Sequence, residues 1–343
     1  MRKLLNTFYV TQPEIYLSLD GETVAARRDD EVLMRIPLHN LEGIVTCGFA
    51  GVSPALMGAC AEKGIALTFL TMNGRFLANV HGIEKGNVLL RKTQYRMSDS
   101  EECSLSIARN MLIGKLHNSR WILERAVRDH ALRLDVEGVK NSARMIANSV
   151  QLIRQAESLG SLRGIEGEAA SRYFAVFNEL ILQNKNDFIF DGRNRRPPLD
   201  RVNALLSFTY TLLSHDTSAA LSAAGLDPFV GFLHRDRPGR RSLALDVMEE
   251  LRAPLADRFV LTLINNRQVE PSGFVQKENG AILMKDETRR ILLTAWQERK
   301  KDQIKHPFLK EKIPWGLVPH SQALLLARYL RGDLDEYPPI LWK

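Results

Sequence analysis

The chain has 343 residues, of which 45% are hydrophobic and 25% are charged. These values exclude a disordered, collagen-like or low-complexity protein and predict two domains, with one large domain as the alternative. Lysine and arginine number 47 against 40 aspartate and glutamate residues, so the formal net charge is +7. This moderate basic excess favours a phosphate-rich partner without naming one.

The chain shows no signature of secretion or membrane insertion. Cys47, Cys60 and Cys103 are too few and too widely spaced for a disulfide framework or a metal-binding cysteine pair, which indicates a reducing compartment. The N-terminal segment meets polar residues too early for a signal peptide, and no apolar stretch reaches the roughly 18 residues of a membrane span. We therefore expect a soluble, cytoplasmic protein with no membrane partner.

The first 95 residues have the pattern of a β-rich domain. Asp20-Gly21 separates two β-type runs and predicts a tight hairpin, because these residues tolerate the positive φ of such a turn, and Asn73-Gly74 repeats the signal. The start and the end of a short helix between the hairpins are marked by Ser53, Pro54 and Gly64. Because strand edges need a cover and no catalytic side chains cluster here, we predict a scaffold or homodimerisation domain at 1–95.

The pattern changes to a helical period in residues 96–343. Ser98 and Glu101 have the spacing of a capping box, which predicts the N-terminus of a long helix. Segments rich in proline, glycine or charge interrupt the helices at 191–198, 235–241 and 306–319. The predicted fold class is therefore α+β, a β-rich N-terminal domain followed by a larger all-α catalytic domain.

Glu166 is a carboxylate on a helix face that we expect to be buried. At 100° per residue it shares a stripe with Ala169 and Tyr173, whereas Glu168 points elsewhere and can pair with Arg172. A buried carboxylate needs a cation, a metal or a hydrogen-bond donor. The alternative is that Glu166 lies in the first turn of its helix, where the helix dipole and water accommodate an anion.

A second group of candidate ligands surrounds one loop and the helix that follows it. His234 lies in the loop, and Asp246 and Glu249 lie three residues apart on the helix. An imidazole and two carboxylates could converge on a divalent cation, and this ligand set suits Mg²⁺, Mn²⁺ or Zn²⁺. The alternative gives His234 a structural role and pairs both acids with Arg252.

Two arginine-rich loops supply candidate phosphate contacts. Their arginines are Arg193, Arg195, Arg196, Arg235, Arg237, Arg240 and Arg241. Phosphodiester chemistry requires a metal that polarises the phosphoryl group and arginines that neutralise and orient the backbone. The alternatives are solvated loop charge, or ion pairs with Asp236, Asp246 or Glu250 that hold the helix in place.

Five sequence blocks in one order resemble the signature of CRISPR-associated protein one, the integrase of CRISPR adaptation. The blocks are Gly164–Phe174, Pro197–Tyr210, Gly231–His234, Ser242–Glu250 and Gln322–Gly332. Each block is weakly specific alone, whereas the ordered set is highly specific. The resemblance is dense in the helical domain and is limited to the layout in the β-rich domain.

The resemblance implies a metal site made of a glutamate, a histidine and a final acid. These fall on Glu166, His234 and Glu249, and Asp246 matches a family acid that supports the site or the DNA. Many relatives carry aspartate where Glu249 stands. Helical spacing from Asp246 favours Glu249 over Glu250 as the last ligand.

The function that the resemblance implies is that of a metal-dependent DNA endonuclease and integrase, with Mg²⁺ or Mn²⁺ as cofactor. It would insert short foreign DNA fragments into a CRISPR array by phosphodiester transesterification. The implied partners are double-stranded DNA, a second copy of the chain and a small ferredoxin-like companion subunit. Two alternatives stay open, a general DNA-repair nuclease acting on branched DNA and a non-enzymatic DNA-binding scaffold.

Overall fold

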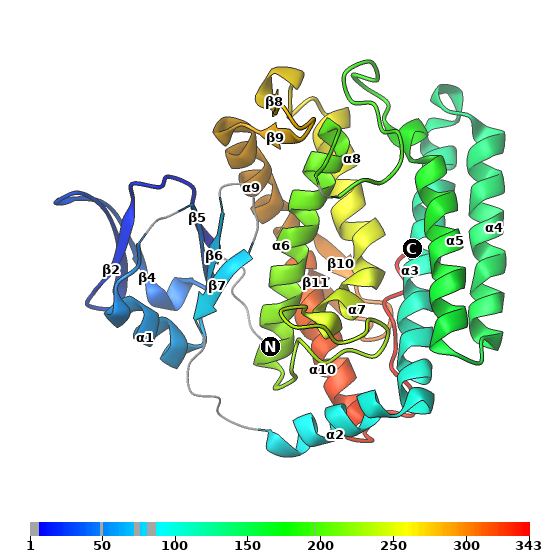
Figure 1. The fold of residues 1–343 in the computed structure, drawn as a ribbon, viewed down its shortest axis with the longest axis horizontal. Coiled ribbons are helices and arrows are strands. Elements are labelled where there is room, and N and C mark those ends of the chain that lie inside the picture. The colour runs from blue at the N-terminus through cyan, green and yellow to red at the C-terminus, as the bar shows by residue number, and fades with distance from the viewer. Residues whose placement is uncertain (1–6, 49–50, 72–75, 81–86, 196) are drawn as a thin grey trace. The chain divides into compact units, whose positions relative to one another are not determined.

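The computed structural model describes residues 7–48, 51–71, 76–80, 87–195 and 197–343 (Figure 1). The chain divides into two compact units. The first comprises Met1–Gly86 and Asp286–Asp302, and the second comprises Asn87–Lys285 and Gln303–Lys343. Strands dominate the N-terminal part and helices the rest, which confirms the predicted α+β class.

The first unit contains an antiparallel sheet of three strands. The strands are β2 (Tyr16–Asp20), β3 (Thr23–Arg28) and β4 (Glu31–Pro37). Asp20 pairs with Thr23 across the first turn, and Gly21 has a φ of 57°. These two observations confirm the hairpin predicted at Asp20-Gly21.

A mixed sheet of four strands completes the β-structure of this unit. Its order is β1 (Thr7–Val10), β5 (Gly43–Cys47), β6 (Ala66–Leu70) and β7 (Phe76–Val80). β1, β5 and β6 are parallel, a feature that the hairpin signals did not predict, and β7 is antiparallel to β6. The predicted turn at Asn73-Gly74 lies outside the described residues.

The helix α1 (Pro54–Lys63) makes the crossover between the parallel strands β5 and β6. The Ser53 hydroxyl accepts a hydrogen bond from the backbone N–H of Leu56, and Gly64 ends the helix with a φ of 67°. The predicted boundaries of this helix are therefore confirmed. Its buried Leu56 packs with Leu17, Ile44 and Leu67 of the strands. The helix α9 (Asp286–Lys301) also belongs to this unit.

The second unit is mainly helical. Its α-helices are α2 (Val88–Asp99), α3 (Glu101–His130), α4 (Val136–Gln155), α5 (Leu159–Ala175), α6 (Arg201–Ala223), α7 (Ser242–Leu251), α8 (Arg258–Asn265) and α10 (Val318–Leu330). α3, α4 and α5 lie side by side (Figure 1). Within the described part of the chain, no helix is long and apolar enough to cross a membrane.

The sequence pattern did not reveal two features of this unit. Two short hairpins, β8 (Phe274–Gln276) with β9 (Ile282–Met284) and β10 (Gln303–Lys305) with β11 (Lys312–Pro314), interrupt the helices. A π-helical turn, Arg252–Asp257, joins α7 to α8. Pro254 lies in this turn and has no N–H for regular helical hydrogen bonding, and such turns are frequent at functional sites.

The predicted capping box at Ser98 and Glu101 is wrong by two residues. Ser100 caps α3, because its hydroxyl accepts a hydrogen bond from the backbone N–H of Cys103. Ser98 lies inside α2, and its hydroxyl donates to the carbonyl oxygen of Gly231 at 2.6 Å. Ser98 and Ser100 both have the residue type and position of a helix N-cap. Local spacing does not distinguish them, because the contact of Ser98 with Gly231 depends on the tertiary fold.

Candidate active site

Two of the predicted ligands meet on one lysine. Glu166 of α5 and Glu249 of α7 both contact the ammonium group of Lys115, which lies on α3. The distance from Lys115 Nζ to Glu249 Oε2 is 2.7 Å. The side chains of Lys115 and Glu249 are 12% and 4% exposed, and that of Glu166 is 27% exposed, so water reaches the cluster only from the side of Glu166. Three helices therefore bring two carboxylates to one shared cation.

The position of Glu166 removes one alternative interpretation. α5 begins at Leu159 with Ser158 as its N-cap, so Glu166 lies about two turns inside the helix and not in its first turn. The helix dipole at the N-terminus therefore does not explain this carboxylate. Glu168 points elsewhere and pairs with Arg172 at 2.6 Å, as the helical spacing predicted.

Glu249 is a buried carboxylate that stays ionised. Burial opposes its ionisation, but the positive charges of Arg252 and Lys115 outweigh that effect and lower its pKa to about 2. Arg252 Nη2 lies 3.0 Å from Glu249 Oε1, so the alternative that pairs both acids with Arg252 is confirmed for Glu249, whereas the carboxylate of Asp246 bonds to the loop of His234. Glu249 thus combines this ion pair with its contact to Lys115.

Asp246 fixes the loop that carries His234. Its fully buried carboxylate accepts hydrogen bonds from the backbone N–H groups of Phe232, Leu233 and His234 at 2.7 to 3.0 Å. His234 Nδ1 lies 2.5 Å from Asp246 Oδ1. With its proton on Nδ1, the imidazole keeps a free electron pair on Nε2, the form that binds a metal. Asp246 therefore has a positioning role.

The loop has room for this arrangement because residue 231 is a glycine. A Cβ atom on Gly231 would lie 2.7 Å from Asp246 Oδ2 and 2.9 Å from the backbone of Ser242. Any side chain would displace the loop or the carboxylate.

Glu250, the residue after Glu249, points into a different environment. Its carboxylate accepts hydrogen bonds from the Tyr337 hydroxyl, from Gln322 Nε2 at 3.0 Å and from the backbone N–H of Ile340 at 2.7 Å. Burial raises its pKa to about 7. The structure thus places Glu249, and not Glu250, beside Glu166.

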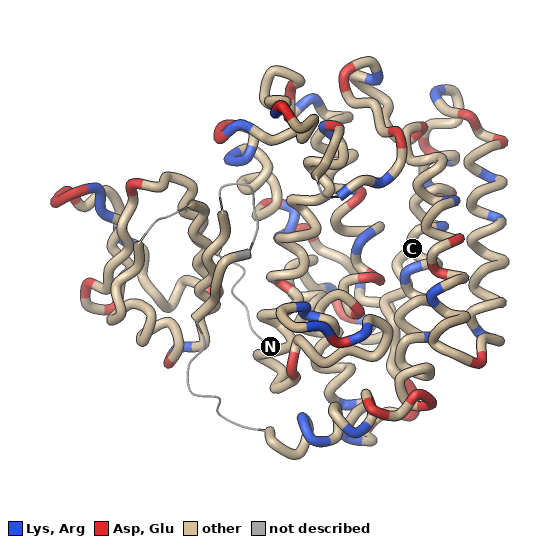
Figure 2. The backbone as a smooth tube through the Cα atoms, in the orientation of Figure 1, with Lys and Arg blue, Asp and Glu red and all other residues tan. Residues whose placement is uncertain are grey.

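The predicted arginines divide into exposed and anchored groups. Arg235 and Arg237 are exposed, and basic positions gather in the loop before α7 (Figure 2). Arg240 is half-buried. Arg241 Nη1 lies 3.0 Å from His215 Nδ1, and burial lowers the pKa of Arg241 to about 10. Arg241 is therefore anchored in the unit, while Arg235 and Arg237 are free to meet a partner.

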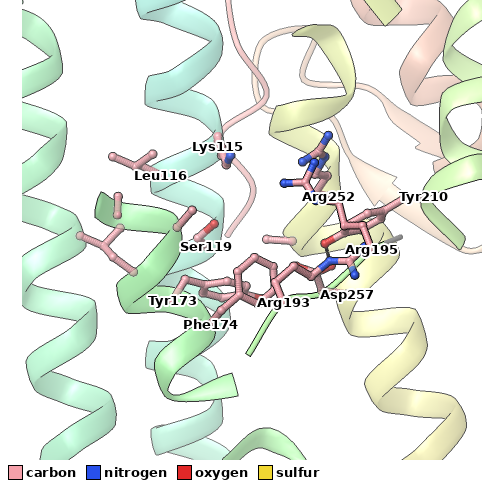
Figure 3. A pocket seen from close by; sticks show the side chains of 14 residues that line it. Lys115, Leu116, Ser119, Tyr173, Phe174, Arg193, Arg195, Tyr210, Arg252 and Asp257 are labelled. Carbon is pink, nitrogen blue, oxygen red and sulfur yellow. Dashed lines mark hydrogen bonds between the residues drawn. The ribbon is translucent and has the colours of Figure 1, made fainter. Parts of the chain in front are cut away.

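The other predicted arginine loop borders a small cavity. Arg193 is half-buried and donates to the side chains of Asn203 and Ser207. Arg195 is exposed, and Arg196 lies outside the described residues. The cavity measures about 70 Å³ and is lined by residues that include Lys115, Tyr173, Arg193, Arg195, Tyr210, Arg252 and Asp257 (Figure 3).

A hydrogen-bonded carboxyl group forms one wall of this cavity. The hydroxyls of Tyr173 and Tyr210 donate to Asp257 at 3.1 and 2.6 Å. The guanidinium groups of Arg193 and Arg252 lie 5.3 and 5.1 Å from the centre of the Tyr210 ring. Arginine and tyrosine side chains thus organise the space next to Glu249.

Sequence reasoning did not single out Lys115 or Asp257. A signal for Lys115 existed, because it follows Met111 by four residues and Ala108 by seven, on the stripe that buries both. A lysine on an apolar stripe indicates a buried anionic partner. Asp257 gave no such signal, because the π-helical turn changes which residues share a face.

The donor set fits a hard divalent cation. Two carboxylates and one imidazole suit Mg²⁺ or Mn²⁺, and Glu249 Oε2 has an ionic contact with Lys115 but no well-aligned hydrogen bond. Among the described residues, no three His, Cys, Asp or Glu side chains form a ready-made metal cluster. In this structure the Lys115 ammonium group contacts both carboxylates.

Comparisons with known proteins show which family and fold this chain has. The chain is 51% identical over 343 residues, all of both chains, to "CRISPR-associated endonuclease Cas1 1" of Chlorobaculum tepidum. A solved casposase bound to an integration product shares the fold, with a TM-score of 0.84 at 21% identity over 98% of this chain and 94% of that one. A chain of a Cas6-RT-Cas1–Cas2 complex has a TM-score of 0.82 at 24% identity, covering 99% of this chain and 36% of that one.

These similarities place the chain among proteins with the fold of the CRISPR-associated endonucleases. The family model described as "CRISPR associated protein Cas1" matches residues 8–298. The chain therefore belongs to the Cas1 family.

Replacing Asp246 with asparagine should lower the free energy of unfolding by about 2–3 kcal/mol, because four donors would then share one acceptor oxygen and face an amide group. Urea denaturation measures this loss. Asp236→Asn is the matched control, since Asp236 is exposed and accepts only a 3.4 Å hydrogen bond in the same loop. Equal stability of the two variants would contradict the positioning role.

Because of Asp257, the free energy of unfolding should decrease as the pH rises. Burial raises its pKa from 3.8 to about 6, so the folded protein binds the proton more tightly than the unfolded chain. Relative to Asp257→Asn, the wild type should lose about 3 kcal/mol of stability as the pH rises from about 3 to 7. Denaturation of both proteins across this range measures the difference. A parallel pH profile would show that Asp257 has an ordinary pKa.

Proposed function

We propose that this protein is a metal-dependent DNA endonuclease and integrase that inserts short foreign DNA fragments into a CRISPR array. The observation that carries the proposal is the convergence of Glu166 and Glu249 on one cation. The 51% identical relative named as a CRISPR-associated endonuclease supports the nuclease class. The casposase bound to an integration product shares this fold and supports strand transfer as the reaction.

The reaction exchanges one phosphodiester for another. The 3′-hydroxyl oxygen of the incoming fragment attacks a phosphorus atom at the end of a repeat, and the bond from that phosphorus to the 3′ oxygen of the recipient strand breaks. The attacking hydroxyl loses its proton and the released 3′ oxygen gains one. Because one phosphodiester bond replaces another, no external energy source is needed.

Glu166, His234 and Glu249 would hold Mg²⁺ or Mn²⁺ at this site. The bound metal supplies polarisation of the phosphoryl group. Asp246 keeps the His234 imidazole in the tautomer with a free Nε2. The exposed Arg235 and Arg237 would neutralise the DNA backbone beside the site.

Partners follow from the same proposal. The chain would bind double-stranded DNA and a small ferredoxin-like companion subunit, and the solved Cas6-RT-Cas1–Cas2 complex supports such a companion for this fold. We place the protein in the cytoplasm. We also assign homodimerisation to residues 1–95 and catalysis to residues 96–343.

Exchange of Glu166 for glutamine should abolish strand transfer, with a loss on the order of a thousandfold, because a neutral amide is a poor ligand for a hard cation. The assay measures joining of a short duplex to a repeat-containing plasmid. Glu168→Gln is the matched control, since Glu168 lies on the same helix but pairs with Arg172 at the surface. The control should keep its activity.

The same assay separates the alternatives. A repair nuclease would cleave branched DNA by hydrolysis without joining the fragment, and a non-enzymatic scaffold would show no activity for Glu166→Gln to remove. Either result would refute the proposed function.

Replacing Arg235 and Arg237 together with alanine should weaken binding to all duplexes alike. The slope of log affinity against log salt should become shallower by up to about two units, since each neutralised phosphate contributes about 0.9. Both side chains are exposed, so the melting temperature should not change. Arg241→Ala should instead lower the melting temperature, because Arg241 is anchored at His215. An unchanged slope in the double variant would contradict DNA contact.

The intact protein should be a homodimer in light scattering at micromolar concentration. Tyr16 on β2 and Leu33 and Met34 on β4 are 44%, 43% and 51% exposed, an apolar surface that a second copy would cover. Exchange of Leu33 and Met34 for serine should shift the protein to the monomer. A monomeric wild type would contradict this assignment.

A further inference from the structure

Lys115 is placed where it can compete with a metal. Its ammonium group contacts the carboxylates of both Glu166 and Glu249 and is largely buried between α3, α5 and α7. A divalent cation bound to the same carboxylates would lie only a few ångströms from this ammonium. Two positive charges at that distance repel strongly in a site shielded from water. The metal and Lys115 therefore cannot hold these oxygens at the same time.

The cavity next to this cluster offers a second position for the same side chain. Lys115 lines it together with Arg193, Arg195 and Arg252 (Figure 3). The carboxyl group among the lining residues is Asp257, which already accepts hydrogen bonds from two tyrosines. The cavity thus carries an excess of positive charge, and its volume of about 70 Å³ suits a phosphate group.

Arg193 shows that this excess of positive charge is not neutralised within the protein. Its guanidinium group is half-buried and donates to Asn203 and Ser207, which are neutral side chains. Among the described residues, no carboxylate forms an ion pair with Arg193. A partly buried guanidinium group that donates to neutral groups and has only the more distant Asp257 as an anionic neighbour favours an anionic ligand.

We propose that Lys115 is the internal counter-ion of the metal-free site, and that metal binding displaces its ammonium group into the cavity, where it binds a phosphate oxygen of DNA. The inference rests on the proposed function and assigns Lys115 two successive partners. In the metal-free protein it neutralises Glu166 and Glu249. In the metal-bound protein it joins Arg193 and Arg195 as a phosphate contact.

Calorimetric titration of the intact protein with Mn²⁺ tests whether Lys115 competes with the metal for Glu166 and Glu249. Lys115→Met should bind Mn²⁺ about tenfold or more tightly than the wild type, because no ammonium group must be displaced. Lys140→Met is the matched control, since Lys140 is an exposed lysine on α4, and it should bind like the wild type. Equal or weaker binding by folded Lys115→Met would overturn the proposal.

Thermal unfolding adds a readout that is independent of activity. Without metal, Lys115→Met should melt at a lower temperature than the wild type, because two carboxylates lose their counter-ion. Mn²⁺ should raise its melting temperature more than that of the wild type. An equal Mn²⁺-induced shift in both proteins would overturn the displacement.

Lys115→Arg keeps the test decisive if the methionine variant does not fold. Guanidinium pairs with carboxylates through two parallel hydrogen bonds, so this variant should bind Mn²⁺ several-fold more weakly than the wild type. Affinity equal to that of the wild type would contradict competition at this site.

Strand transfer at saturating Mn²⁺ tests whether Lys115 contacts a phosphate oxygen of DNA in the metal-bound protein. Lys115→Met should be about tenfold or more slower than both the wild type and Lys140→Met, and unchanged transfer would overturn the phosphate contact. A wild type that neither binds Mn²⁺ nor joins DNA would refute the proposed function itself. A wild type that does both, with no tighter binding by Lys115→Met, would refute the Lys115 assignment alone.

Discussion

Two carboxylates held close together in a shielded site are the constraint on which the second unit depends. Glu166 and Glu249 come from different helices, and their mutual repulsion must be cancelled before these helices can pack. Lys115 bridges the two, and Arg252 neutralises the second oxygen of Glu249. The contacts of Lys115 link α3 to α5 and α7, whereas Arg252 and Glu249 lie only three residues apart. The charge balance therefore contributes to how α3, α5 and α7 meet, and we propose that it makes this point attractive to a divalent cation.

The side chains around Glu166 and Glu249 fix the positions of neighbouring residues. Asp246 uses both oxygens to fix the loop before α7, so that His234 presents one ring nitrogen in a defined form. The π-helical turn after α7 places Asp257 and Arg252 on one cavity wall with Tyr210. Hydrogen bonds thus hold Asp246 and Asp257 in place near the carboxylates of Glu166 and Glu249, while these two carboxylates share the cation Lys115. The proposed metal binding and phosphate contact both need rigid supporting groups and a charge that can be replaced.

Local sequence signals predicted the features that depend on neighbouring residues. Turn residues located the first hairpin, and Ser53 and Gly64 located both ends of α1, because caps act within one helical turn. Helical spacing placed Glu166 on an inward face. It did not reveal that Lys115, 51 residues earlier, is the partner of Glu166, because ion pairs between helices depend on tertiary packing. Spacing also failed at the π-helical turn, where the periodicity itself changes, and at Ser98, whose hydroxyl bonds to a distant loop.

We propose that Glu166 and Glu249 share one cation position, which Lys115 fills until a metal replaces it. Anomalous diffraction from crystals of the protein with Mn²⁺ can locate both the metal and the lysine. We expect an anomalous peak within about 2–2.6 Å of oxygens from both carboxylates and of His234 Nε2. We also expect the Lys115 ammonium group to have turned into the neighbouring cavity. A peak elsewhere, or a lysine still lying between the two carboxylates beside a bound metal, would contradict the proposal.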